Sequence, residues 1–299
     1  MMKKFIRFCF KGLGITVLIL FALDLLFTGV MQEATPRTKY QFLRQLKNKH
    51  INYIFIGSSR VDNGIVPEVI QKKTGKSSVN LGFQASKMND LYTMLQLINA
   101  YKISYDTLYV QIDYNYNLKG YSNMMKYEIM PFIHENAATR HYAHTQLADD
   151  PLLFYMPFYR YAQNDLKIGV REFLMNCVGK KTFVTTTHGY NSLEGSHTSH
   201  SYRLPKKIAP KNPTFEAMKT YIKTHNMRVR FFCAPFCLKV NNKAYLQQLK
   251  QRIPDLIDFS SVVTNDHFFN NCAHLNDAGA NYFTQFFVEH ELQNSSKVE

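Results

Sequence analysis

The chain has 299 residues, of which 45% are hydrophobic, and its formal net charge is +14 at pH 7. This apolar content is enough for a folded core and excludes an intrinsically disordered chain. The lysines and arginines are scattered and form no arginine-rich arm, so the charge argues against nucleic-acid binding. It favours contact with an acidic polymer or a membrane surface.

Residues 1–31 have the pattern of a membrane anchor. An apolar run extends from about residue 12 to residue 31, and about 20 apolar residues are enough to cross a bilayer. Basic residues on the N-terminal flank keep that end in the cytoplasm, so we expect the rest of the chain to lie outside, in the periplasm or at the cell surface of a bacterium. The basic residues of this flank are Lys3, Lys4, Arg7 and Lys11.

Asp24 interrupts the apolar run. A carboxylate at this depth is costly unless it reaches the interface or pairs with another helix. The alternative is a cleaved signal peptide with its apolar core at Ile15–Ala22. The segment Phe27–Glu33 contains no clear small-x-small cleavage site, which favours an uncleaved, single-pass anchor in the inner membrane. Residues 32–48 are polar and basic and are predicted to be a tether leading into a short helix.

Strands and helices alternate from residue 49 to residue 292, which predicts an α/β domain with a mainly parallel sheet between helices. Short apolar runs that end at glycine or polar residues indicate strands, and apolar residues at helical spacing indicate helices. The predicted strands are Asn52–Gly57, Ser78–Gly82, Thr107–Ile112, Arg228–Cys233 and Leu256–Phe259. The predicted helices are Val66–Lys73, Met88–Tyr101, Phe215–His225, Asn242–Arg252 and Asp277–Glu291.

The stretch from about residue 118 to residue 205 departs from this alternation and is rich in tyrosine, phenylalanine and histidine. We expect an insertion over the carboxyl edge of the sheet, where such folds place their sites. His197 and His200 lie in a polar loop of this stretch, but no acidic or cysteine partner is near them in sequence, which argues against a metal site. No metal and no cofactor is expected.

The cysteines give no metal or redox motif. Cys233 and Cys237 are separated by three residues, whereas redox and zinc motifs use a spacing of two. We interpret the cysteines as small buried hydrophobic residues, and one disulfide of undetermined pairing remains an open alternative. The five cysteines are Cys9, Cys177, Cys233, Cys237 and Cys272.

Two polar motifs could carry chemistry. Ile56–Arg60 follows the first predicted strand, and a serine on a sharp strand-to-helix turn presents its hydroxyl at the top of a sheet. Cys272–Gly279 precedes the last helix and contains His274, which would return to the same edge. A serine needs such a base to become a nucleophile. Taken singly, the serine turn is a weak signal, since such a loop can simply cap the following helix, and a helix-start or packing role is the favoured interpretation of His274.

Together, the motifs resemble the SGNH/GDSL family of serine hydrolases and acyltransferases, in its membrane-anchored bacterial envelope branch, over about residues 50–290. The resemblance implies a three-layer α/β/α, flavodoxin-like fold. It also implies that Ser59 is the nucleophile and His274 the general base. Asn80–Gly82 and Asp113–Asn115 are similar to the family's second and third blocks. The implied oxyanion donors are therefore the amides of Ser59 and Gly82 and the side chain of Asn115.

Three residues depart from the family pattern. Ser58 replaces the usual aspartate before the nucleophile, and Asp113 stands in place of the third-block glycine. The third departure is Asn271, three residues before His274, where the family usually has an aspartate. Asparagine can orient an imidazole but cannot stabilise its charged form, which weakens catalysis. Asp266 could take the third place if its loop folds back; otherwise the site is a dyad or the protein has lost turnover.

The resemblance implies hydrolysis of acyl esters, or transfer of acyl groups such as acetyl, on an exported or cell-envelope polysaccharide or another acylated glycan. A transferase would use a membrane-bound acyl-donor partner, and a lipid-directed esterase remains open. The alternative is a binding or assembly factor for polysaccharide export. In that case the basic surface would hold an acidic glycan and the tyrosine-rich insertion would stack on sugars.

Overall fold

The structure is a computed structural model that describes residues 1–196 and 201–293. Its internal contacts divide the chain into two compact units. Met1–Thr35 and Lys126–Lys180 form the first, which we call the helical unit. Pro36–Met125 and Lys181–Glu299 form the second, which we call the sheet unit. Each unit is described separately.

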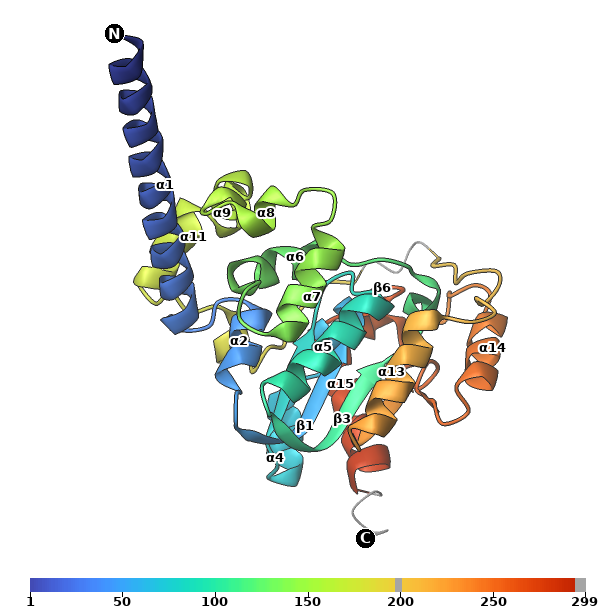
Figure 1. Ribbon diagram of the computed structural model, residues 1–299. Coiled ribbons are helices and arrows are strands. Elements are labelled where there is room, and N and C mark those ends of the chain that lie inside the picture. Colours follow the sequence, from blue (N-terminus) through green and yellow to red (C-terminus); the bar gives the residue numbers. More distant parts are fainter. Residues whose placement is uncertain (197–200, 294–299) are drawn as a thin grey trace. The chain divides into compact units, whose positions relative to one another are not determined.

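Within the described residues, five parallel strands form the central sheet of the sheet unit, in the order β2-β1-β3-β4-β5. This is the strand order of flavodoxin-like, doubly wound sheets. Figure 1 shows β1 and β3 of this sheet side by side. The predicted α/β class with a parallel sheet is therefore confirmed. The strands are β1 (His50–Gly57), β2 (Ser78–Gly82), β3 (Ser104–Gln111), β4 (Val229–Cys233) and β5 (Ile257–Asp258).

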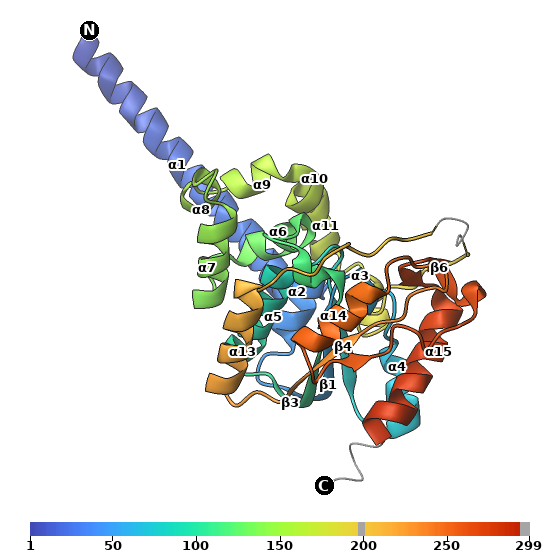
Figure 2. The same cartoon turned by 90° about the vertical axis from the view of Figure 1, so that its right-hand side faces the viewer.

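Helices cover both faces of this sheet, as Figure 2 shows. On one face α4 (Pro67–Thr74) packs beside α15 (Asp277–Phe287), and on the other α5 (Met88–Ala100) packs beside α13 (Pro213–Thr224). The remaining helices in the described part of this unit are α2 (Lys39–Gln45), α3 (Ser59–Asp62), η1 (Tyr114–Asn117), α12 (Phe183–Thr186), α14 (Ala244–Arg252), η3 (Asp266–Phe268) and the short π-helix η4 (Val288–Leu292).

Aromatic packing holds β1 at the centre of the sheet. Phe55 is fully buried, its ring stacks on Tyr109 of β3 at 5.1 Å, and it meets Phe287 of α15 edge-on at 5.4 Å. Burying a phenylalanine side chain contributes roughly 1.5–3 kcal/mol. The turn at the end of β1 is therefore anchored on a rigid strand.

Most of the segment predicted to be a tether, from Pro36 onward, is part of the folded sheet unit, whereas its first residues end α1. Thr38 and Gln41 form a capping box at the start of α2, where the Gln41 amide donates to Thr38 Oγ1 at 3.2 Å. Tyr40 and Leu43 of this helix are fully buried. The predicted short helix is present, and it packs into the core instead of spanning a gap.

The helical unit joins the N-terminal helix to residues from the middle of the chain. Helix α1 (Met2–Glu33) is long and apolar enough to cross a membrane. Residues 126–180, which the sequence places in an insertion over the sheet, form helices in the same unit as α1. They are the end of α6 (Asn123–Ile129), η2 (Met130–Phe132), α7 (Ala137–Gln146), α8 (Leu152–Tyr155), α9 (Tyr159–Gln163), α10 (Asp165–Ile168) and α11 (Val170–Cys177).

Candidate active site

The serine turn follows β1 directly. Gly57 ends the strand, and a Cβ at this position would lie 2.3 Å from Val61 Cγ2, so only glycine fits. The amide and the hydroxyl of Ser58 both donate to Gln111 Oε1 at 2.9 Å. Ser58 is thus held inward, and Ser59 opens α3 with its side chain at the carboxyl edge of the sheet.

His274 reaches Ser59 from the other end of the chain. It lies in a two-stranded hairpin of β6 (Phe269–Asn271) and β7 (His274–Leu275), just before α15. The distance from Ser59 Oγ to His274 Nε2 is 2.7 Å, although 215 residues separate the two. This is hydrogen-bond distance for a nucleophile and its base.

The start of α15 explains the local motif around His274. Asn276 caps the helix, since its Oδ1 accepts the Gly279 amide at 3.0 Å. A Cβ on Gly279 would lie 1.9 Å from the Phe268 carbonyl oxygen, so a glycine is needed for the helix to approach this turn. The asparagine and the glycine therefore fix the backbone on which His274 stands.

Asn271 is the third member of the chain of hydrogen bonds. Its Oδ1 lies 2.9 Å from His274 Nδ1 and also accepts the Ala273 amide at 3.0 Å. A carbonyl oxygen only accepts, so the imidazole carries its proton on Nδ1 and leaves Nε2 free to accept from the Ser59 hydroxyl. The arrangement is Ser-His-Asn.

The imidazole is neutral at pH 7. Burial, reinforced by the positive charge of Arg60, lowers the pKa of His274 from 6.5 to about 4, and the charge of Asp62 opposes this in part. A neutral imidazole can accept a proton, but a low pKa means that the imidazolium is poorly stabilised.

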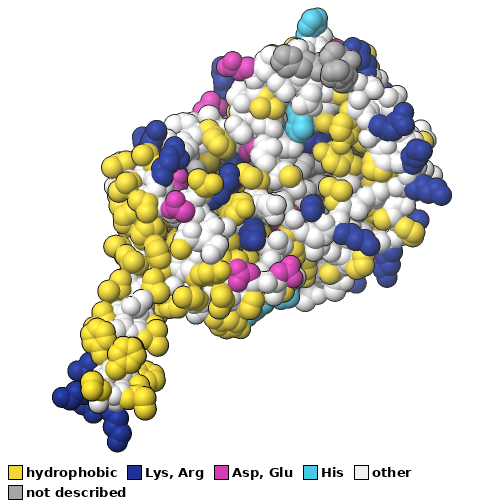
Figure 3. Space-filling model, turned by 90° about the horizontal axis from the view of Figure 1, so that it is seen from above, with side chains coloured by type: hydrophobic (Ala, Val, Ile, Leu, Met, Phe, Trp, Pro, Cys, Tyr) yellow, Lys and Arg dark blue, Asp and Glu magenta, His cyan; other side chains and the backbone are white. Residues whose placement is uncertain are grey.

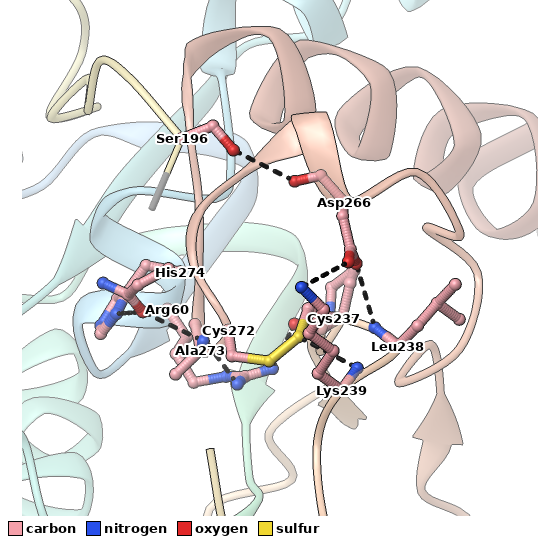
Figure 4. Close-up of a disulfide and its surroundings, with 11 residues drawn as sticks. Arg60, Ser196, Cys237, Leu238, Lys239, Asp266, Cys272, Ala273 and His274 are labelled. Carbon is pink, nitrogen blue, oxygen red and sulfur yellow. Dashed lines mark hydrogen bonds and ion pairs between the residues drawn. A yellow bond between two sulfur atoms is a disulfide. The ribbon is translucent and has the colours of Figure 1, made fainter. Parts of the chain in front are cut away.

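Asp266 does not reach His274. Its Oδ1 accepts the Leu238 amide at 3.4 Å, and its Oδ2 lies 3.8 Å from Lys239 Nζ. Figure 4 shows this carboxylate turned toward Leu238 and Lys239, with His274 on another side. The structure therefore brings Asn271, and not Asp266, to the imidazole.

The expected oxyanion donors Gly82 and Asn115 are engaged elsewhere. The Gly82 amide donates to Asn80 Oδ1 at 3.0 Å. The Asn115 side chain is fully buried, donates to the Gln111 carbonyl oxygen at 3.3 Å and accepts the Asp113 amide. Among the described residues the Ser59 amide, in the first turn of α3, donates to no protein acceptor. Of the three expected donors, this amide is the one left free.

Gly82 has a packing role instead. A Cβ there would lie 2.4 Å from the Asp62 amide nitrogen, so glycine lets α3 lie close against β2. Asn80 completes this contact by donating to the carbonyl oxygens of Val61 and Ile65 at 2.7 and 2.8 Å. These residues position the serine turn.

Arg60 is a site residue that the sequence did not indicate. Its side chain is buried, and its Nε lies 2.7 Å from the Asp113 carboxylate. It donates to three carbonyl oxygens from two distant segments and lies over the Phe236 ring at 3.4 Å. An arginine after a turn serine is usually exposed, and only the tertiary structure shows its acceptors. These are the carbonyl oxygens of Ala273 (3.2 Å), Ala234 (2.5 Å) and Pro235 (2.7 Å).

A disulfide holds the loop that carries His274. It joins Cys237, after β4, to Cys272, two residues before the histidine. The Cys237 amide also donates to the Cys272 carbonyl oxygen at 3.1 Å. The disulfide at Cys272 and the Arg60 contact to the Ala273 carbonyl oxygen therefore hold the two residues directly before His274. The other three cysteines, Cys9, Cys177 and Cys233, are free.

His197 and His200 lie outside the described residues. No protein-family model matches the sequence, and no curated protein matches it significantly. Fold and function therefore rest on the residues and their geometry.

Proposed function

We propose that this protein is a serine-dependent esterase or O-acyltransferase that acts on an acylated glycan outside the cytoplasm. The observation that carries the proposal is the chain of contacts from Ser59 Oγ to His274 Nε2 and from His274 Nδ1 to Asn271, at 2.7 and 2.9 Å. Its members come from the start and the end of the sheet unit, and they meet at the carboxyl edge of the sheet, where doubly wound folds bind ligands.

The reaction uses these residues in order. Ser59 Oγ attacks the ester carbonyl carbon while its proton passes to His274 Nε2. The carbonyl oxygen becomes an oxyanion, which the Ser59 amide stabilises. When the tetrahedral intermediate collapses, the ester C–O bond breaks and the leaving alcohol takes the proton from His274. Water or a sugar hydroxyl, deprotonated by His274, then attacks the acyl-enzyme, and Ser59 recovers its proton.

A location on the outer side of a bacterial inner membrane fits the same molecule. The basic tip of α1 favours a cytoplasmic N-terminus, and the Cys237–Cys272 disulfide suits an oxidising compartment. The net charge of +14 suits an acidic envelope polysaccharide as acceptor or substrate.

The test is covalent labelling with a fluorophosphonate probe, which reacts with activated serines. We expect labelling of the wild type and none of Ser59→Ala, with His274→Ala strongly reduced because the hydroxyl then lacks its base. Ser192→Ala, an exposed serine on another loop, is the matched control and should label like the wild type. If Ser59→Ala labels as strongly as the wild type, the catalytic proposal is wrong.

The second candidate is a glycan-binding or assembly factor without turnover. Two observations favour it: the third member of the hydrogen-bond chain is a neutral amide, and Gly82 and Asn115 donate within the protein. A wild type that binds an acidic glycan, resists the probe and cleaves no acetyl ester would support this candidate over the enzyme.

A further inference from the structure

The helical unit carries large apolar side chains on its outside. Val170, Leu174 and Val178 follow one another at four-residue spacing in and just after α11, and residues so spaced share a helix face. They are 55%, 51% and 73% exposed, and Leu166 of α10 is 96% exposed. Such exposure is unusual for a surface that meets only water. With two exposed residues of α8 these form what we call the apolar rim: Leu152, Tyr155, Leu166, Val170, Leu174 and Val178.

Helix α11, which carries Val170 and Leu174 of the rim, and helix α9 both pack on α1. Phe173 of α11 stacks on Phe27 of α1 at 4.3 Å, and Phe27 also meets the ring of Tyr161 at 5.2 Å. The Tyr161 hydroxyl lies 2.7 Å from Thr28 Oγ1. One face of α11 thus packs on α1, while another carries exposed rim residues.

An ion pair joins helix α1 to helix α9 and accounts for the acidic residue in the apolar run of α1. Asp24 Oδ1 lies 2.8 Å from Arg160 Nη2, and Asp24 Oδ2 accepts the Phe158 amide at 2.7 Å. Both side chains of the ion pair are largely buried, at 14% and 3% exposure. A paired carboxylate is tolerated at a depth where a single one is costly.

The position of Asp24 gives the depth of the attachment. Lys11 is the last basic residue of α1, and at a rise of about 1.5 Å per residue Asp24 lies about 20 Å beyond it along the axis. The hydrocarbon core of a bilayer is about 30 Å thick, so Asp24 lies about 10 Å inside the outer boundary. Figure 3 shows the apolar side chains that cover α1 and the basic ones at its tip. Helices bonded to α1 at Asp24 therefore begin within the outer leaflet.

We propose that the apolar rim is a lipid-binding surface, immersed in the outer leaflet of the membrane that α1 crosses. Apolar faces of interfacial helices enter a bilayer by about 5–10 Å, which agrees with the depth of Asp24. Lys167 and Arg171 are exposed and each directly follows a rim residue, so they can reach lipid phosphates. The inference rests on the proposed membrane crossing of α1 and is independent of the proposed chemistry.

Tryptophan reporters test this surface, because the natural chain contains no tryptophan. The full-length chain carries one reporter at a time: Leu174→Trp in the rim, Leu18→Trp in the apolar part of α1, and Leu238→Trp as a control. Leu238 belongs to the sheet unit and is 54% exposed, close to Leu174 at 51%. Each variant is reconstituted in phosphatidylethanolamine and phosphatidylglycerol vesicles. Fluorescence is then quenched with brominated phospholipids or with aqueous acrylamide.

We expect brominated lipids to quench Leu174→Trp most when the bromines are shallow and Leu18→Trp most when they are deep. Leu238→Trp should respond only to acrylamide. If Leu18→Trp is quenched by lipid and Leu174→Trp behaves like Leu238→Trp, the rim proposal is wrong and the anchor stands. Shielding of Leu174→Trp from both quenchers would overturn the proposal in favour of a second copy of the chain. If brominated lipids quench neither Leu18→Trp nor Leu174→Trp, the proposed membrane crossing of α1 is wrong as well.

Discussion

The charge around His274 decides how strong a base it is. Among the described residues, Nδ1 of His274 meets the neutral Oδ1 of Asn271, and the positive charge of Arg60 disfavours the imidazolium form. Transition-state imidazolium is therefore stabilised less than in a triad with a carboxylate. We expect slow turnover from a correctly assembled site.

Replacing Asn271→Asp should increase the rate on a model acetyl ester. The carboxylate keeps the contact to Nδ1 and adds the missing negative charge. Its loss from a well-studied triad costs about 10⁴-fold, so we expect a gain on the order of tenfold. Asp266→Asn is the control and should change little, because Asp266 faces Leu238 and Lys239. If Asp266→Asn lowers the rate and Asn271→Asp leaves it unchanged, then Asp266, and not Asn271, is the residue that supports His274.

The low pKa of His274 predicts the pH dependence of the wild type. Because the base is neutral above about pH 4, kcat/KM should stay flat from pH 7 down to about pH 5 and fall near pH 4. Asn271→Asp adds a negative charge, raises this pKa and moves the acid limb toward neutral pH. If the acid limb of the wild-type profile lies near pH 6.5, burial does not lower the pKa of His274 and this prediction is wrong.

The same shift affects stability. The unfolded chain, with a histidine pKa near 6.5, binds a proton more readily than the folded one, so the contribution of His274 to stability is lost as pH falls from 6.5 toward 4. Thermal unfolding measured over this range reports the effect directly.

At the scale of elements, the loop from Phe269 to Leu275 is the least regular part of the site. Its two strands are short and irregular, so the backbone hydrogen bonds alone hold His274 weakly. The Cys237–Cys272 disulfide and the Arg60 contact to the Ala273 carbonyl oxygen supply the missing constraint.

Removing this disulfide should lower both stability and activity. The bridge closes a sequence separation of 35 residues, and the chain-entropy model assigns such a loop about 4 kcal/mol. We expect Cys237→Ser/Cys272→Ser to unfold at lower temperature and to label more slowly with the fluorophosphonate probe, because His274 is then less well placed. Cys177→Ser, which alters an exposed free thiol, is the matched control.

Thiol counting checks the pairing itself. Under denaturing, non-reducing conditions three cysteines should alkylate, and five should do so after reduction. Five reactive thiols before reduction would show that the bridge is absent.

At the scale of the molecule, the N-terminal helix and the helices of residues 126–180 form one unit. Cleavage after a signal peptide would remove the partner of Arg160 and expose the ring of Tyr161. The fold itself therefore favours retention of α1.

We expect the mature protein to keep α1 and to expose its remaining chain outside the inner membrane. Protease added to intact spheroplasts should digest the sheet unit, while a cytoplasmic marker protein stays intact. N-terminal sequencing that begins near Gln32 would instead establish a cleaved signal peptide.

The amino-acid sequence by itself determined the helices and strands that have strong periodic signals. The strand Ser78–Gly82 was predicted with its observed bounds, and the pairing of Ser59 with His274 followed from their positions at the ends of the first strand and before the last helix. Local spacing carries this information, because parallel strands bring their carboxyl ends to one edge.

Only the tertiary structure decided which groups each site residue meets. The Asn271 contact to His274, the burial of Arg60 and the engagement of Gly82 and Asn115 within the protein all depend on atoms that are distant in sequence or on the path of a loop. The union of α1 with residues 126–180 likewise rests on the Asp24–Arg160 pair, which joins charges 136 residues apart. Periodicity encodes which face of an element is apolar but not which partner covers it.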